Sequence, residues 1–98
     1  MSKNRFITDL RAGTELLHEP FLLHDVVRRQ SKDGRPFLLA TLRDRTGQMA
    51  GVYWDVPLSV DVWARPGLAV LVSGRVNLYK EALQVNISEL ERANGLDM

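Results

Sequence analysis

Basic and aromatic side chains are concentrated between residues 28 and 54. The part from 28 to 45 holds six basic against two acidic residues, although the whole chain of 98 residues has a net charge of only +1. Phe37, Tyr53 and Trp54 belong to the same stretch. Cationic groups neutralise phosphates, and aromatic rings stack on unpaired bases. The pattern favours binding of single-stranded RNA or DNA over the alternative of an ordinary solvated surface with mixed charge.

The candidate contacts to such a strand are of three kinds. Cations in two predicted loops would neutralise phosphates: Arg28, Arg29, Lys32 and Arg35 on one rim, and Lys80 on the other. Rings would serve as stacking platforms: Phe37, Trp54 and Tyr79. Further side chains of the strands between the loops would complete the surface: Leu39, Arg43 and Gln84. We expect Tyr53 to lie in the core. For Trp54, a place in the core and a place on the surface are equally expected.

Catalytic and metal-binding groups are not indicated. The chain has no cysteine, and no serine or threonine has an evident base partner. His24 and Asp25 form an "HD" pair, but they fall within a predicted strand, where neighbours point to opposite faces. Only His18 remains, so no set of three ligands with metal spacing is apparent. We therefore predict a binding module without a metal, a cofactor or chemistry of its own.

Five strands and one short helix are expected to position these residues. Alternating or β-branched stretches predict strands over residues 20–30, 35–44, 48–54, 68–77 and 83–88. Between the third and fourth, residues 56–65 predict a short helix capped by Asp55 and ended by Pro66 and Gly67. In the turn at 44–47, Asp44 would bond the backbone amides, and Gly47 would adopt a positive φ.

The direction of each side chain can be argued from the second strand. Arg43 would be costly inside a small barrel, so it must face water together with Phe37, Leu39 and Thr41. The set that faces the core is then Leu38, Ala40 and Leu42. On the third strand, Gln48, Ala50, Val52 and Trp54 would face out unless a bulge intervenes. On the fourth, Ser73, Arg75 and Asn77 would face out.

This order of elements predicts an all-β fold, the five-stranded Greek-key barrel called the OB-fold, with one short helix between strands three and four. We expect residues 1–98 to form a single OB-fold domain, with a lead-in segment at 1–15 and a frayed tail at 93–98. No apolar run approaches the ~18 residues of a membrane span, so a cytoplasmic protein without membrane contact is expected.

Several short pieces resemble a known family. The chain is similar to the anti-codon-type OB domain, and more closely to the N-terminal OB domain of the YhaM-type 3′-5′ exoribonucleases. The pieces that carry the resemblance, in order, are "RFITDLRAG", "FLL", "DGRPFL", "LRDRTG", "VYWD", "VSGRV" and "LYKEALQVNISEL".

The resemblance implies a module that binds single-stranded RNA, or DNA, and supplies it to a C-terminal HD-type hydrolase domain in the parent protein. Whether the chain is a fragment or a free-standing protein stays open at this point. The alternative function is a module for protein–protein interaction or oligomerisation, in which the face of Phe37, Leu39 and Trp54 packs against a partner.

Overall fold

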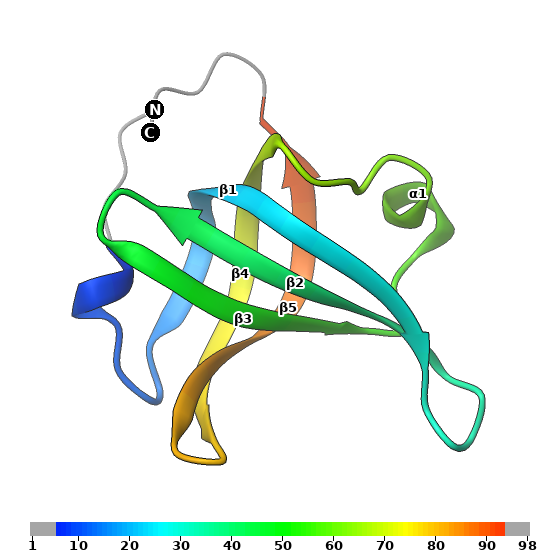
Figure 1. Ribbon diagram of the computed structural model, residues 1–98, viewed down its shortest axis with the longest axis horizontal. Helices are drawn as coiled ribbons and strands as arrows, with labels where there is room; N and C mark the ends of the chain where they lie inside the picture. Colours follow the sequence, from blue (N-terminus) through cyan, green and yellow to red (C-terminus); the bar gives the residue numbers. More distant parts are fainter. Residues whose placement is uncertain (1–5, 94–98) are drawn as a thin grey trace.

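Five strands close on themselves into a barrel in the computed structural model, which describes residues 6–93 (Figure 1). The strands are β1 (Glu15–Gln30), β2 (Pro36–Asp44), β3 (Gly47–Trp54), β4 (Leu68–Tyr79) and β5 (Ala82–Arg92). Their order around the barrel is β1-β2-β3-β5-β4, and all pairs are antiparallel except β3 with β5. A 3₁₀ turn, η1 (Ile7–Asp9), precedes β1, and the helix α1 (Leu58–Asp61) lies between β3 and β4. The predicted OB-fold architecture is confirmed.

The core is filled by the alternate residues of each strand. On β2, Leu38, Ala40 and Leu42 are buried, while Arg43 is exposed, as the alternation predicts. Tyr53 is only 7% exposed and belongs to the same core cluster. The pairing of β2 with β3 runs from Phe37–Trp54 to Asp44–Gly47 without a bulge, so the predicted parity of β3 holds as well. Side chains opposite one another in this ladder share a face of the sheet.

Bulges make two strands differ from the sequence prediction. β1 begins five residues before the predicted start, and its pairing with β4 shifts between Leu16 and Glu19, where His18 has a φ of 49°. β4 shifts its register to β5 between Ser73 and Gly74. Ser73 is therefore buried, where unbroken alternation placed it on the outer face. Its hydroxyl oxygen accepts a hydrogen bond from the backbone N–H of His18.

The connections also correct two expectations. The helix is only four residues long, and Pro57 rather than Asp55 precedes it, since Asp55 has a φ of 52° and bonds Arg35 instead. Gly47 has no positive φ. Asp44 does bond the turn: its Oδ1 accepts from the Thr46 N–H at 2.7 Å, and its Oδ2 accepts from the Ile7 N–H at 2.8 Å.

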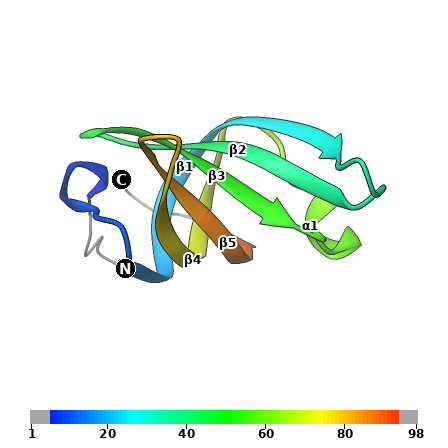
Figure 2. The ribbon, with the colours of Figure 1, turned by 90° about the horizontal axis from the view of Figure 1, so that it is seen from below.

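Two hairpin ends project from the barrel on either side of β3. The β1–β2 loop and α1 lie toward the same end of the molecule, and the β4–β5 loop lies away from them (Figures 1 and 2). The predicted tail reaches into residues 94–98, which lie outside the described residues. Within residues 6–93, none of the helices has the length and apolar character that a membrane crossing needs.

Candidate nucleic-acid interface

The outer surface of β2, β3 and β5 forms a hollow of about 780 Å³ between the two hairpin ends. Its lining includes five of the residues predicted as contacts: Phe37, Leu39, Trp54, Tyr79 and Gln84. Register explains why they meet: Phe37 lies opposite Trp54, and Leu39 opposite Val52. On the other side of β3, Ala50 lies opposite Gln84. We call this surface the strand face.

One end of the strand face is aromatic and cationic. The rings of Phe37 and Trp54 are 4.5 Å apart between centroids and tilted by 37°, and Trp54 is 37% exposed. The Arg35 guanidinium lies 4.9 Å from the centroid of the Trp54 ring, which is a cation–π geometry. The result is a short stack of two rings and one cation, in which the guanidinium and part of Trp54 are exposed to solvent.

Asp55 holds the cation of this stack in place. The distance from Arg35 Nη2 to Asp55 Oδ2 is 2.6 Å, and Arg35 Nε donates to the other carboxylate oxygen at 3.2 Å. This hydrogen bonding lowers the pKa of Asp55 below its ordinary value and raises the pKa of Arg35. The carboxylate therefore occupies the same guanidinium edge that a phosphate would need.

The opposite end carries Tyr79 and Lys80. Tyr79 is 55% exposed, and the Lys80 ammonium lies 5.3 Å from its ring centroid. Lys80 and Glu81 form the hairpin turn, both with positive φ, of 50° and 66°. Between the two ends, Asn77 and Asn86 line the hollow together with Gln84, so amide side chains lie along its middle.

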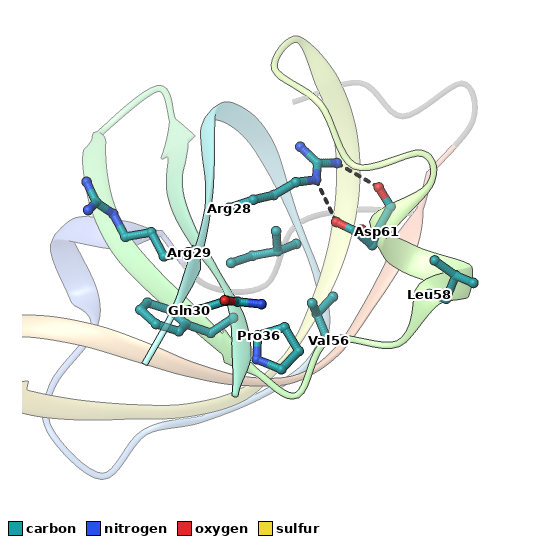
Figure 3. Close-up of a pocket in the computed structure, with 9 residues that line it drawn as sticks. Arg28, Arg29, Gln30, Pro36, Val56, Leu58 and Asp61 are labelled. Atoms are coloured by element: carbon teal, nitrogen blue, oxygen red, sulfur yellow. Dashed lines mark hydrogen bonds and ion pairs between the residues drawn. The ribbon is translucent and has the colours of Figure 1, made fainter. Parts of the chain in front are cut away.

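Four cations were expected along the first rim, and the structure separates Arg28 from the others. Arg29 lies opposite Phe37 and shares its face, while Lys32 is exposed in the loop. Arg28 lies opposite Leu38 and points to the other side of the hairpin. There its Nε is 2.6 Å from Asp61 Oδ1, and its Nη2 donates to the Asp61 carbonyl (Figure 3). The same Nη2 also donates to the Ala64 carbonyl. Arg28 thus fixes α1 to β1 rather than lining the strand face.

Arg43 and Leu39 were both predicted as contacts, but only Leu39 lines the hollow. Arg43 lies opposite Gln48 on the outer side of the sheet, exposed and beyond the residues that line the hollow. Leu39 lines the hollow and is half-buried. The lining residues that were not among the predicted contacts include Asp25, Val27, Asn77, Leu78 and Asn86. The outward alternation of Asn77 and Asn86 was a usable signal, whereas the contribution of β1 depends on a register that the sequence does not display.

The fold brings together one group of potential metal ligands that the chain separates widely. His18 Nδ1 lies 3.1 Å from Glu91 Oε1 and 3.8 Å from Glu89 Oε1, all on the surface near the β1 bulge. A hydrogen bond between the two carboxyls raises the pKa of Glu89. Sequence spacing indicated no such set. Exposed groups of this kind are common without an ion, and we assign it no function.

A closed five-stranded barrel whose β2–β3 face lies between the β1–β2 and β4–β5 loops has the architecture of an OB-fold domain. The family model described as the OB-fold nucleic acid binding domain, of tRNA anti-codon type, matches residues 23–93, and the chain belongs to this family. The family is thus one of nucleic acid binding domains with the OB-fold.

Named relatives share the same region at low identity. The chain is 28% identical over 76 residues to the 3′-5′ exoribonuclease YhaM of Listeria innocua, covering 78% of this chain and 24% of that protein. It is 25% identical over 83 residues to the YhaM of Halalkalibacterium halodurans, covering 85% and 26%. The chain thus spans about a quarter of the length of these relatives.

Solved structures share the fold. The second OB-fold domain of replication protein A from Methanococcus maripaludis has a TM-score of 0.65 at 19% identity, covering 96% of this chain and 98% of that one. The protein PriB from Ralstonia solanacearum has a TM-score of 0.64 at 18% identity, covering 87% and 100%. At these identities the likeness concerns the fold alone.

Proposed function

We propose that this domain binds single-stranded nucleic acid, with RNA as its natural ligand, along the strand face. The observation that carries the proposal is the half-exposed pair of Phe37 and Trp54 in a hollow bounded by two cation-bearing loops. Bases would stack on the rings, since such stacking is insensitive to base identity. Phosphates would meet Arg29, Lys32 and Arg35 at one end and Lys80 at the other, with Arg43 further along β2.

RNA is preferred over DNA in this proposal because the relatives that match over this region are named as exoribonucleases. In a parent protein of that kind, the domain would hold the substrate strand while a separate hydrolase domain cleaves it. The domain itself would supply affinity for the strand, and the chemistry would belong to the hydrolase domain.

The test is fluorescence anisotropy with a labelled RNA of about 12 nucleotides, a length within the range that OB folds cover. Binding should weaken steeply between about 50 and about 200 mM salt, because bound phosphates release counterions. Trp54→Ala and Phe37→Ala should each weaken binding by about 1–3 kcal/mol, the usual loss for one stacked base. A duplex of equal length should bind less well, since its bases are already stacked on one another.

The control is Val62→Ala, an exposed residue just after α1 and outside the strand face, which should bind as the wild type does. Circular dichroism would verify that all variants fold. Affinity that is independent of salt and of Trp54 would contradict the proposal. If the domain instead self-associates with rising concentration and Trp54→Ala disrupts the association, the alternative of an interaction module would be supported.

A further inference from the structure

A second hollow, of about 470 Å³, lies between the end of the β1–β2 hairpin and α1 (Figure 3). The register of β1 against β2 places most of its lining on the side of the hairpin opposite the strand face. Arg28 pairs with Leu38 and Gln30 pairs with Pro36, so these four residues point to the side of the hairpin that faces α1. Arg29 and Phe37 point to the strand face. We call the second hollow the hairpin pocket. It is lined by Arg28, Gln30, Pro36, Leu38, Val56, Leu58 and Asp61, with Arg29 and Phe37 at its edge.

The chemistry of the hairpin pocket suits a flat heterocycle. Pro36, Leu38 and Val56 supply apolar walls. The Gln30 side chain lines the hollow, and its amide points toward the α1 side (Figure 3). A glutamine amide offers donor N–H groups beside an acceptor oxygen, the arrangement that pairs with the polar edge of a base. The volume falls within the range of about 300–1,000 Å³ that is usual for small-ligand sites.

The wall of the pocket is held by the Arg28 bonds. Its Nη2 donates to the Asp61 carbonyl at 2.6 Å and to the Ala64 carbonyl at 2.7 Å, in addition to the ion pair with the Asp61 carboxylate. Asp61 is the only carboxylate in the lining of this pocket, and Arg28 neutralises it. The remaining cation, Arg29 at the rim, forms no ion pair with a described residue. The site is therefore locally positive and suits an anionic ligand.

The pocket is continuous with the strand face. Phe37 lines both hollows, and Arg29 stands beside it at the edge between them. A strand that stacks on Phe37 can therefore turn over the hairpin edge, with Arg29 placed to bind the phosphate at the turn.

We propose that the hairpin pocket takes one unpaired base of the strand bound on the strand face. The Gln30 amide hydrogen-bonds the polar edge of this base, and Arg29 binds the adjoining phosphate. This inference rests on the proposed function, and it adds a base-reading contact to a surface that otherwise holds bases by stacking.

The first experiment follows the ¹⁵N-labelled 98-residue chain by NMR during titration with oligouridine of about 12 nucleotides. We expect the side-chain amide resonances of Gln30 and the backbone amides of Val56 and Leu58 to shift together with those of the strand face. If the strand-face amides shift and the Gln30 and Val56 signals do not, the inference is wrong while the proposed function stands. If no signal shifts, both fail.

The second experiment compares oligouridine with oligouridine methylated at N3. The methyl group removes the N3–H donor from which the Gln30 amide oxygen would accept a hydrogen bond, while the base can still stack. The wild type should bind the unmethylated strand about five-fold more tightly, which corresponds to one net hydrogen bond. Gln30→Leu keeps the side-chain volume and removes the polar atoms, so this variant should bind both strands alike.

The matched control is Gln48→Leu, an exposed glutamine at the other end of the β2–β3 sheet that lines neither hollow. It should retain the wild-type preference for the unmethylated strand. A Gln30→Leu variant that also retains the preference would overturn the inference, because the base edge would then be read elsewhere.

Discussion

Arg35 is the residue in which stacking and charge meet most directly. Its guanidinium lies over Trp54 and is bonded on its outer edge by Asp55. A phosphate that approaches this end of the strand face competes with the carboxylate for the same donors. Asp55 consequently both orients the cation and reduces its attraction for an anion.

Replacing this carboxylate should strengthen nucleic-acid binding. We expect Asp55→Asn to raise the affinity for single-stranded RNA about two- to five-fold, the scale of one exposed ion pair. The slope of log K against log salt should steepen by about 0.7, because one more phosphate is neutralised. Anisotropy titrations at several salt concentrations measure both quantities.

Asp33→Asn is the matched control, since Asp33 lies in the same β1–β2 loop as Arg35 but forms no ion pair with it. It removes the same charge without releasing the guanidinium, so its effect should be smaller. Equal effects of the two variants would mean that Asp55 acts only through long-range charge. A loss of affinity in Asp55→Asn would mean that its main role is to orient Arg35 on the ring.

At the scale of elements, the bulge in β4 is the clearest departure from regular alternation. A Cβ atom added at Gly74 would lie 2.3 Å from the backbone carbonyl oxygen of Asn86 on β5. Because the obstacle is backbone rather than a flexible side chain, the strands would have to separate. The close approach of β4 and β5 at this point therefore requires glycine.

Gly74→Ala should lower the free energy of unfolding by about 1–3 kcal/mol, the usual cost of overpacking. Thermal or urea denaturation followed by circular dichroism would measure it. Gly47→Ala is the control: its added Cβ would make an ordinary 3.7 Å contact with Ile7, and its φ is not positive. Equal stability of the two variants would show that β4 and β5 can separate at the bulge without cost.

The elements show where sequence reasoning is strong and where it is limited. The alternation of Leu38, Ala40 and Leu42 against Arg43 fixed the faces of β2, because a buried cation is costly. The bulges at His18 and Ser73 were not predictable, since they depend on pairing between strands far apart in the chain. The helix was overestimated because β-branched residues such as Val56, Val60 and Val62 disfavour a helix, and only Leu58–Asp61 form one turn.

In the candidate site, too, local alternation was predictable and long-range packing was not. The face shared by Phe37 and Trp54 followed from the alternation along β2 and β3. The position of Arg28 did not, because the choice between Asp61 and the strand face depends on where α1 packs. Cations were predicted from their place in the sequence, and only the register of β1 against β2 separates Arg28 from Arg29.

At the scale of the whole molecule, Tyr53 links pH to the stability of the barrel. Burial raises the pKa of Tyr53 above its ordinary value of about 10, and the nearby charge of Glu89 adds to the shift. The folded state therefore holds this proton more tightly than the unfolded chain does. Its contribution to stability is complete below the unfolded pKa and is lost as the pH rises through the folded pKa.

The melting temperature should thus fall as the pH rises above about 10, and Tyr53→Phe should reduce this alkaline loss. Tyr79→Phe is the control, because Tyr79 is largely exposed and should leave the loss unchanged. Differential scanning fluorimetry across this pH range measures the three proteins side by side. An identical alkaline fall in Tyr53→Phe would show that another group controls it.

The barrel closes through its shortest ladder, the three pairs Ala50–Gln84, Gly51–Val85 and Val52–Asn86 of β3 and β5. All six residues except Val85 also line the strand face. The β3–β5 pairing that closes the barrel therefore lies beneath the surface on which we place the polynucleotide. A ligand that lies across this pairing would contact both β3 and β5, whose separation would open the barrel. Occupancy and closure would then be thermodynamically linked, and the loaded domain would resist opening at the seam more than the empty one.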